Sequence, residues 1–523
     1  MKTKLLYLLF SFSTLLNSQT FTRNFPIPQI SQAYTLGSTA PIVTTSDGGY
    51  ILHYSYGYPD LHGGPLFSEI IKTDAAFLPL WKKVLYGSNG KKTFTFGDGS
   101  IILSENAFSQ NNISFSIEKL DANGNSSWRK YDYEVYPNKI DIRDAIQKDN
   151  NTIKFAGVKT FNIGQLFGSF STPVIMDFDL NGNFVQGISL TIPSSTSPGS
   201  HTIESICKEP SGNYYVFTLG LGSVRHVAKF SPTNTLIWCK QISFNNYNFS
   251  GINSTVILSN GDLLIGGSYN NYSLSIATFA LMRITSNGTL VWSKTINDYK
   301  TVINGVQELS PTEIIVTGSM YQNYLPRSIV MKVDANGNTV WAKKYSNAFT
   351  ISEVFRKASN DWYYAAFSYS LSDGHPFIFN TENNGNTVCT TEDISFNFVN
   401  NPASLSTVSI TVNPLSLLTP LSITNSGQTE TQSYVDNCLP LAVSDFNPSK
   451  KCVIYPNPSN GLVNISSDNT INKITINTIL GQTVNVFYPN SLESNFTIES
   501  SGMYLVTVET DFGSQGFKVL ITK

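Results

Sequence analysis

Apolar and polar residues alternate in short stretches over residues 41–390. The stretch Met331-Lys332-Val333-Asp334 is typical, and a period of two predicts half-buried β-strands. Pairs such as Asn336-Gly337 separate these stretches. Asn-Gly between two apolar runs is a strong hairpin signal, because tight hairpin turns need a positive φ that glycine and asparagine tolerate. The pattern therefore predicts repeated units of strand, turn and strand.

One such unit, clearest at Met331–Tyr345, recurs seven times at intervals of about 50 residues. Its turn carries Asp334 and Asn336-Gly337, and Trp341 and Lys343 follow. A second turn precedes each unit by about 25 to 30 residues, so each repeat holds four strands. The aromatic position of the seven copies is occupied by Trp81, Trp128, Gln186, Trp238, Trp292, Trp341 and Cys389, of which Gln186 and Cys389 mark degenerate copies.

Four-stranded antiparallel units at this period predict a β-propeller. We therefore expect an all-β fold, with a seven-bladed β-propeller over residues 20–390. Residues Phe21–Phe25 have two interpretations, an outer strand that closes the ring and a loose arm. The expected blades are residues 41–86, 93–135, 141–190, 201–243, 252–298, 302–346 and 349–390.

The repeats resemble the Asp-x-Asn-Gly-Asn-x-x-Trp-x-Lys repeats of secreted Bacteroidetes proteins. The resemblance covers about residues 40–390 and implies a fold rather than an activity. Other propeller families match less well. The Gly-His and Trp-Asp pairs of WD repeats are absent, and the spacing from Asp334 to Gly337 and Trp341 differs from that of a sialidase Asp box.

The N-terminus is predicted to be a secretory signal peptide, residues 1–19. Lys2 and Lys4 precede a short apolar run, Leu5–Leu16, and Ser18 offers a small residue near a cleavage point. No later apolar run approaches the ~20 residues that a membrane helix needs. We expect a secreted or cell-surface protein that passes through the periplasm and does not span a membrane.

Residues 391–451 form a Ser/Thr/Asn-rich segment and linker. No charged residue occurs from Ser395 to Thr429. Short alternating runs such as Thr407–Val412 read as strands. Two interpretations are open, extra strands packed on the propeller and a semi-extended spacer.

Residues 452–523 alternate like a small all-β unit with Gly and Pro between its strands. They resemble the type A C-terminal sorting domain of the Bacteroidetes type IX secretion system. The resemblance implies a small β-sandwich that the outer-membrane secretion machinery recognises. The residues that carry it are Tyr455, Pro456, Asn457, Pro458, Gly461, Gly502, Tyr504, Lys518 and Lys523.

The five cysteines are Cys207, Cys239, Cys389, Cys438 and Cys452. None has the close spacing of a zinc site. Cys389 and Cys438 flank the segment after the last blade, and we predict that they form a disulfide. The alternative is two unrelated buried thiols. Cys207 and Cys239 fall on the first and fourth strands of one blade, which are not neighbours, so no bond is expected there.

Several kinds of chemistry have no support in the sequence. The net charge is −2 without a basic cluster, which disfavours nucleic acid and anionic membranes as partners. The five histidines form no His-Glu-x-x-His motif, and no P-loop or Gly-x-Ser-x-Gly elbow occurs. The Asp-x-Asn-Gly-Asn turns have the wrong spacing for a calcium loop. We therefore expect no cofactor, metal or catalytic residue.

The two faces of such a propeller differ. Turns between first and second and between third and fourth strands are tight, whereas connections on the other face are long and suited to binding on a rigid scaffold. Aromatic residues on that face can stack on sugars or peptides, or they pack over blade edges. The candidate ligand-binding residues are Tyr54, Tyr56, Tyr58, His62, Tyr269, Tyr272, Tyr321, Tyr324, Arg327 and His375. The leading hypothesis is a binding or adhesion module for glycan or protein. The alternative is a polysaccharide hydrolase or lyase with carboxylates in the central channel.

Overall fold

The structure is a computed structural model of the chain that forms two compact units, Met1–Cys438 and Leu439–Lys523. Every element among the described residues is a β-strand. No helix in the described part of the chain is long and apolar enough to cross a membrane. The structure describes residues 22–24, 35–36, 40–57, 66–86, 88–107, 115–132, 139–162, 169–193, 201–220, 224–244, 249–271, 276–296, 301–322, 325–345, 349–356, 362–368, 376–381, 384–386, 391–396, 398–400, 403–415, 422–423, 429–430, 435–437, 452–479, 482–510 and 513–523.

The first unit contains seven antiparallel sheets in these residues, numbered here in chain order. Sheet 1 consists of β2 (Thr35–Leu36), β3 (Ala40–Thr44), β4 (Tyr50–Gly57), β5 (Leu66–Thr73) and β6 (Pro79–Tyr86). Sheet 2 consists of β7 (Ser88–Thr95), β8 (Ile101–Ala107), β9 (Phe115–Leu120) and β10 (Ser126–Asp132). Sheet 3 consists of β11 (Ile140–Asp149), β12 (Thr152–Asn162), β13 (Ser169–Asp179) and β14 (Phe184–Thr191). Sheet 4 consists of β15 (Thr202–Lys208), β16 (Tyr214–Leu219), β17 (Arg225–Phe230) and β18 (Leu236–Phe244).

The remaining sheets follow the same order of strands from the centre outward. Sheet 5 consists of β19 (Phe249–Ile257), β20 (Leu263–Asn271), β21 (Ile276–Ile284) and β22 (Leu290–Ile296). Sheet 6 consists of β23 (Thr301–Ser310), β24 (Glu313–Gln322), β25 (Leu325–Asp334) and β26 (Thr339–Tyr345). Sheet 7 consists of β27 (Phe349–Arg356), β28 (Trp362–Ser368), β29 (Pro376–Thr381) and β1 (Thr22–Asn24).

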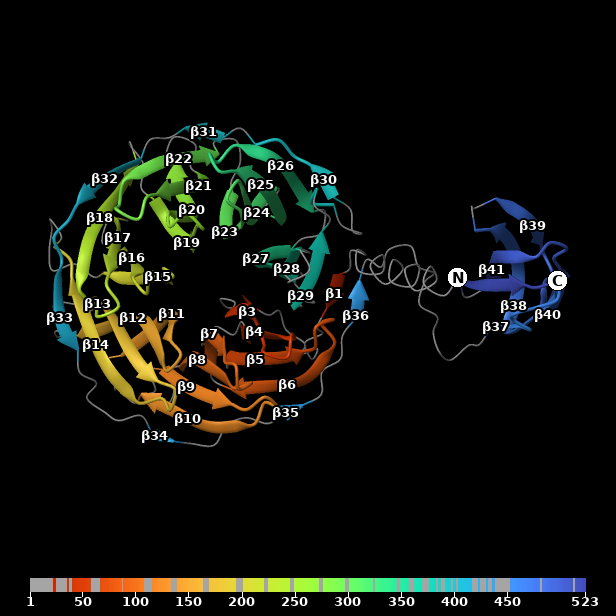
Figure 1. Ribbon diagram of the computed structural model, residues 1–523, viewed down its shortest axis with the longest axis horizontal. Helices are drawn as coiled ribbons and strands as arrows, with labels where there is room; N and C mark the ends of the chain where they lie inside the picture. The colour runs from red at the N-terminus through yellow and green to blue at the C-terminus, as the bar shows by residue number, and fades with distance from the viewer. Residues whose placement is uncertain are drawn as a thin grey trace, which may run out of the picture. The chain divides into compact units, whose positions relative to one another are not determined.

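The seven sheets follow one another in a circle, with the first strand of each sheet toward the centre (Figure 1). Each first strand contacts the next sheet, and β27 of sheet 7 lies against β3 of sheet 1, which closes the circle. Unit 1 is therefore a ring of small sheets, each covered on both faces by its neighbours.

The fourth strand of sheet 7 comes from the other end of the chain. β1 pairs with β29, with Thr22 opposite Phe379. Within Phe21–Phe25, residues Thr22–Asn24 thus form an outer strand rather than a loose arm. The blade expected at residues 349–390 therefore does not take its fourth strand from the residues that follow β29. Those residues lead to sheet 6, where Thr391 pairs with Tyr345.

Residues 391–437 are named here the belt, because their strands add one outermost strand to every sheet (Figure 1). The belt visits the sheets in reverse order, from sheet 6 down to sheet 1 and then sheet 7. Of the two interpretations of this segment, the structure has the extra strands. The pairs are β30 (Thr391–Asp393) on β26, β31 (Phe398–Asn400) on β22, β32 (Ala403–Thr407) on β18, β33 (Thr411–Leu415) on β14, β34 (Ser422–Ile423) on β10, β35 (Thr429–Glu430) on β6, and β36 (Val435–Asn437) on β1.

The belt also fills the space between sheets. Sheets that radiate from a centre diverge outward, and the wedge between them must be packed. Phe396 enters the core between sheets 5 and 6, with its ring 6.2 Å from that of Phe279. Ala403 packs between sheets 4 and 5, Val412 between sheets 3 and 4, and Leu415 between sheets 2 and 3. Apolar side chains of the belt thus pack into the core. The stretch from Ser395 to Thr429 is otherwise polar and uncharged, whereas Glu392 and Asp393 pair with Lys344 and Lys343.

A tryptophan near the start of the fourth strand reaches the turn of the next sheet. Trp81 Nε1 donates to Ala122 O (3.0 Å), Trp238 Nε1 to Ser286 O (3.2 Å) and Trp292 Nε1 to Ala335 O (3.1 Å). The ring lies on the glycine of the same turn. A Cβ placed on Gly337 would lie 2.9 Å from the Trp292 ring, and the residue has φ +73°. Glycine is therefore needed there both for backbone conformation and for space.

The aspartate of the repeat shapes the same turn. Asp334 Oδ1 accepts hydrogen bonds from the backbone N–H groups of Asn336 (2.9 Å) and Asn338 (2.7 Å), and Asn338 Nδ2 donates to Asp334 Oδ2 (2.9 Å). These bonds lower the pKa of Asp334 against the opposing effect of burial, which is the largest single influence. Turn chemistry thus accounts for the whole Asp-x-Asn-Gly-Asn motif.

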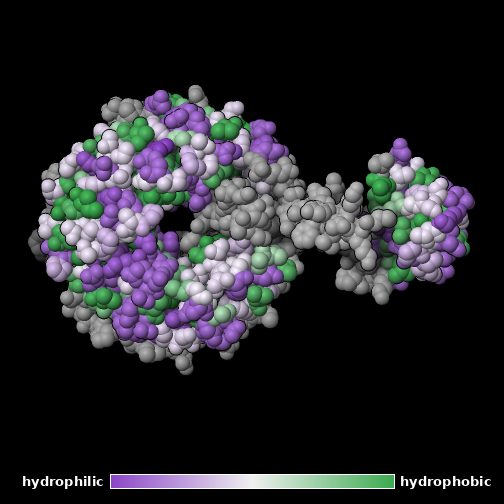
Figure 2. Space-filling model, viewed as in Figure 1, coloured by the Kyte–Doolittle hydropathy of each residue, from purple (hydrophilic) through white to green (hydrophobic). Residues whose placement is uncertain are grey.

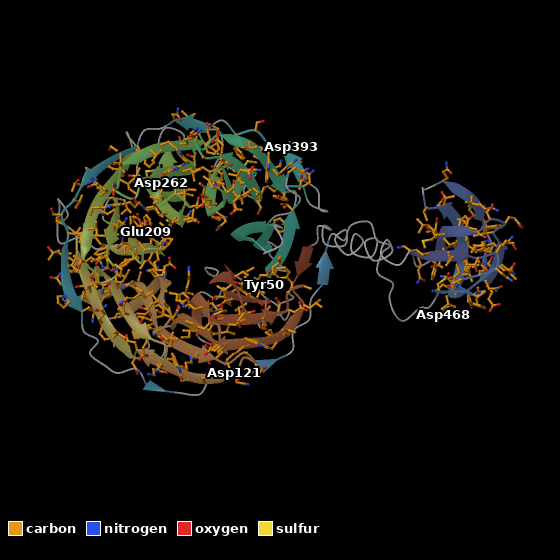
Figure 3. The ribbon with its side chains drawn as sticks, in the orientation of Figure 1. Tyr50, Asp121, Glu209, Asp262, Asp393 and Asp468 are labelled. Carbon is orange, nitrogen blue, oxygen red and sulfur yellow. The ribbon has the colours of Figure 1, made fainter. Side chains whose placement is uncertain are left out.

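Cations on the third strand join turns of two sheets. Lys229 Nζ lies 2.7 Å from Glu209 Oε1 in its own sheet and donates to Ser286 O of the next sheet (3.1 Å). Arg283 likewise lies 2.7 Å from Asp262 Oδ2. Figure 3 labels Glu209 and Asp262, which lie on turns of the neighbouring sheets 4 and 5. The face that carries the tight turns is therefore occupied by contacts between sheets.

The interface between sheets 1 and 2 encloses a buried polar cluster. His53 Nδ1 lies 2.8 Å from Thr93 Oγ1, and His53 Nε2 lies 3.8 Å from Glu105 Oε1. Glu105 is held by Arg129, with Nη2 and Oε2 2.8 Å apart. Burial lowers the pKa of His53 to about 3, so this histidine is neutral at physiological pH.

Two of the cysteine expectations fall on described residues. Cys207 in β15 and Cys239 in β18 are free thiols, as predicted. Cys389 and Cys438 lie outside the described residues, so their disulfide stays a prediction. They flank the belt, which begins at Thr391 and ends at Asn437.

We expect Gly337→Ala to destabilise unit 1 more than Gly261→Ala. Both glycines have positive φ, but a Cβ on Gly261 would meet nothing within 4 Å. Gly261→Ala should therefore lower the free energy of unfolding by only about 1–2 kcal/mol, which is the cost of a left-handed backbone for a residue with a Cβ. Gly337→Ala should lower it by roughly a further 1–3 kcal/mol, because the Trp292 ring must move. Chemical denaturation of the full chain measures both, and equal losses would contradict the contact.

We also expect acid to destabilise unit 1 through His53. An unfolded histidine has a pKa of about 6.5, so as the pH falls the unfolded chain binds this proton first. The contribution of neutral His53 to the free energy of unfolding is therefore complete above pH 6.5. It declines as the pH falls toward 3, by up to about 1.4 kcal/mol per pH unit. His53→Gln, which stays neutral, should show a shallower decline of the free energy of unfolding from pH 6.5 to 4.5. Parallel curves for the two proteins would show that His53 is not responsible.

Candidate functional site

The predicted ligand-binding residues divide into two groups. Tyr54 lies in β4 with 1 % of its surface exposed, so for this residue packing is the right interpretation. The reason is that β4 and β5 pair as far as Gly57 and Leu66, which leaves Tyr54 inside the ladder. Arg327 is half-buried on β25, opposite Met320.

The other candidates are not placed by the structure. Tyr56, Tyr269 and Tyr321 lie at the ends of β4, β20 and β24, and their side chains are outside the description. The remaining candidates fall wholly outside the described residues: Tyr58, His62, Tyr272, Tyr324 and His375. The ligand-binding face therefore stays a prediction.

The first strands of the sheets share an irregularity beside the centre of the ring. In six sheets the register shifts at the same place, and the extra residue is polar each time. Such bulges re-aim a side chain away from the ladder. The extra residues are Lys91, Arg143, Glu204, Asn253, Asn304 and Ser352.

Two carboxylates at these bulges are engaged by cations. Asp144 lies 2.9 Å from Lys92 Nζ of sheet 2 and accepts the backbone N–H of Ile206 in sheet 4 (3.0 Å). Glu204 lies 3.0 Å from Arg225 Nη2. Burial raises the pKa of Glu204, although Arg225 opposes it. Both carboxylates thus tie strands together through ion pairs and hydrogen bonds.

The described residues hold no group of three or more His, Cys, Asp and Glu side chains that could bind a metal ion. The face of unit 1 seen in Figure 2 mixes hydrophilic and hydrophobic residues in small areas. Neither observation assigns a ligand to the ring.

The tail unit offers a more specific site. Its longest strand, β38, pairs with four other strands, and its alternating apolar residues form the core with β41 and β42. Buried residues include Val463, Ile474, Val506 and Val519. The strands are β37 (Cys452–Tyr455), β38 (Leu462–Thr478), β39 (Thr483–Phe487), β40 (Ser491–Thr497), β41 (Gly502–Thr510) and β42 (Gly513–Ile521).

The first motif of the tail holds its last strand. Asn457 Nδ2 donates to Lys518 O (2.7 Å), and the backbone N–H of Leu520 donates to Asn457 Oδ1 (2.9 Å). Ser459 forms a parallel bridge with Ile521, in which Ser459 N donates to Leu520 O (2.8 Å). Residues 457–459 therefore act as a further strand on the edge of β42, and we name them the clamp.

The other residues of the predicted sorting motif lie around the same strand. A Cβ on Gly461 would lie 2.8 Å from Lys523 Cε. Lys523 Nζ lies 2.9 Å from Glu499 Oε2. Tyr504 OH donates to Ser500 O (3.1 Å), just before Gly502 opens β41. Motif residues 60 or so positions apart in sequence thus form one structure around the C-terminal strand.

Two serines outside the predicted motif also hold β42. Ser459 pairs with β42, and Ser501 Oγ accepts the backbone N–H of Lys523 (3.0 Å). Serines are frequent in this chain, so composition and spacing do not mark these two. They contact β42 because that strand runs antiparallel to β41 and parallel to the clamp.

We expect Asn457→Ala to loosen β42. It removes both side-chain bonds to the β42 backbone, which should lower the free energy of unfolding of the tail by about 1–2 kcal/mol. Hydrogen exchange measures this directly, since the amide of Leu520 should lose protection. Asn464→Ala, half-buried on β38, is the control and should change stability by less than about 0.5 kcal/mol. Unchanged protection of Leu520 in Asn457→Ala would refute the clamp.

Comparisons with solved structures give likenesses at low identity. PorZ, a surface component of the type IX secretion system of Porphyromonas gingivalis, is 9 % identical, with 93 % of this chain and 81 % of that chain covered and a TM-score of 0.28. Drosophila Semaphorin 1a, extracellular domains 1–2, is 7 % identical, with 69 % and 87 % covered and a TM-score of 0.39. The extracellular domain of a putative one-component system of Bacteroides thetaiotaomicron is 10 % identical, with 97 % and 99 % covered and a TM-score of 0.28. At these values the likenesses carry no inference about function.

No curated protein matches the chain. A family described as the secretion system C-terminal sorting domain matches residues 453–522. This range covers the tail from β37 to the end of β42 and includes the clamp. The chain therefore ends in a type IX sorting domain, the export signal of a secreted or cell-surface protein.

Proposed function

We propose that this chain is a type IX secreted surface protein whose seven-bladed β-propeller binds a glycan or a protein. The observation that carries the proposal is the combination of an export tail with a closed ring of small sheets.

The propeller assignment is supported by the strand order. Each sheet of unit 1 has four strands that run outward from the centre, and the seven sheets succeed one another around the ring. A strand from the N-terminus completes the last sheet, which joins the two ends of the ring. Four-stranded units in radial repetition are the defining arrangement of a propeller.

The binding face is inferred from what the other face does. The tight turns are occupied by tryptophan, lysine and arginine side chains of neighbouring sheets. The sequences of the opposite connections carry the tyrosines and histidines named above. Aromatic rings beside amides and hydroxyls suit sugars and peptides, and rigid scaffolds usually place binding residues on loops.

A polysaccharide hydrolase or lyase is the second candidate. Its support is the set of polar bulge residues beside the centre of the ring, Arg143 and Glu204 among them. The ion pairs of Asp144 and Glu204 favour the binding module over this alternative.

The Cys389–Cys438 disulfide is part of the proposal. Thr391 pairs with Tyr345, and Asn437 reaches Phe379 through Thr22. The rings of Tyr345 and Phe379 are 5.4 Å apart, so both ends of the belt approach one contact. A disulfide there would close the belt into a covalent loop and would stabilise unit 1 by roughly 4 kcal/mol in the chain-entropy model.

Two variants of the full chain test the proposal. Deletion of residues 452–523 should leave unit 1 folded but retained in the periplasm of a bacterium with type IX secretion. Simultaneous replacement of Tyr56, Tyr272 and Tyr321 by alanine should abolish binding on glycan and protein arrays, with an unchanged melting temperature. Normal surface delivery of the truncated chain would refute the export route. Unchanged array binding of the triple variant would refute the ligand face.

A further inference from the structure

Strand β41 of the tail is apolar on both of its faces. Tyr504, Val506 and Val508 are buried in the core. Met503 and Leu505 point to the opposite side and are 48 % and 37 % exposed. A sheet with one solvated face normally alternates apolar and polar residues, so the core does not explain these two side chains.

The neighbouring strand extends this apolar surface. Met503 is opposite Leu520 of β42, which is 37 % exposed. Met503, Leu505 and Leu520 therefore form one exposed apolar surface over two strands, named here the outer patch. Contiguous exposed apolar residues with a polar edge are typical of interaction sites.

The edge of the outer patch is polar and carries one cation. Asn477 and Lys518 flank Leu505 in the same row of the sheet. The Lys518 side chain is exposed, while its backbone carbonyl is used by the clamp. Farther along β41, Lys473 and Glu509 neutralise each other at 2.8 Å. A matching partner surface would therefore be apolar with a carboxylate opposite Lys518.

The size of the outer patch argues against a permanent partner. Stable interfaces use about 20 to 30 residues a side, whereas the outer patch offers three apolar side chains. A second copy of the chain would not be held by so small a surface. A contact that forms and is released, as export requires, fits this size.

Three residues of the predicted sorting motif are engaged within the tail. Asn457, Gly461 and Lys523 hold β42 in place. Lys518, which belongs to the same motif, has an exposed side chain at the edge of the outer patch.

We propose that the outer patch is the surface through which the tail docks transiently on a protein of the export machinery, with Lys518 facing a carboxylate of that protein. This rests on the proposed function, in which the tail directs export.

The test compares matched pairs of substitutions in the full chain, expressed in a bacterium with type IX secretion. Met503→Thr with Leu520→Thr keeps strand-forming residues but removes the apolar side chains of the outer patch. Val453→Thr with Leu492→Thr does the same to exposed residues of β37 and β40, which are 42 % and 53 % exposed and pair with other parts of β38. We expect the first pair to lower surface delivery at least about tenfold, equivalent to 1.4 kcal/mol of docking, with accumulation in the periplasm. The second pair should be delivered like the wild type.

Charge variants test the same surface without altering its apolar residues. Lys518→Glu should impair delivery, and Lys518→Arg should retain it. Protease resistance of the purified proteins should be the same for all variants, and if the threonine pair fails this check the Lys518 variants decide. A concentration-dependent dimer in sedimentation that Met503→Thr with Leu520→Thr abolishes would assign the outer patch to a second copy and overturn the proposal.

The outcome separates this inference from the proposed function. If deletion of residues 452–523 blocks delivery while the outer-patch and Lys518→Glu variants are delivered normally, the tail is the export signal and the outer patch is not its docking surface. If the deleted chain is also delivered, the export role itself fails.

Discussion

Neighbouring sheets of unit 1 hold each other through one repeated contact, a tryptophan ring seated on the glycine of the next sheet's turn. The indole N–H donates to the turn backbone, as Trp292 does to Ala335 O at 3.1 Å. A small sheet has two apolar faces and cannot bury either alone. The contact sets the distance and angle at which the next sheet covers it. Because the tryptophan and the glycine belong to different repeats, each repeat specifies its neighbour as well as itself.

The exceptions follow the same rule. Sheet 3 has Gln186 in place of tryptophan, and the turn it faces in sheet 4 has Asn234 at φ +65° instead of glycine. Gln186 donates to Asp177 (2.7 Å), and Asn234 accepts from Lys154 (2.6 Å). The corresponding turn of sheet 1 has Phe77, whose ring stacks on Tyr50 at 4.3 Å. In these turns the glycine that a tryptophan ring would contact is absent, and polar or aromatic contacts are found instead.

The repeated features of the sequence are the ones that predict the ring. Asn-Gly turns and period-two strands mark the units, since both depend on local backbone geometry. Alignment of each repeat on its own tryptophan does not show that Trp81 contacts Gly124 of the following repeat. The sequence allows two interpretations of the belt, because its strands are two to five residues long and their partners lie far away in sequence. Alternation alone does not show that the β4 ladder continues past Tyr54 to Gly57 and so buries that side chain.

The belt gives the sheets a second kind of neighbour. A strand at the edge of a sheet leaves a row of unpaired backbone groups that invites aggregation, and the belt covers this row in all seven sheets. Its direction also has a mechanical meaning. The belt ends at β36, the strand of unit 1 that is nearest to the tail along the chain. Without the proposed Cys389–Cys438 bond, tension on the tail during transport would load the three residues of β36 first and would then separate the belt strands from sheet 1 onward to sheet 6, whereas the bond would carry the tension past the belt.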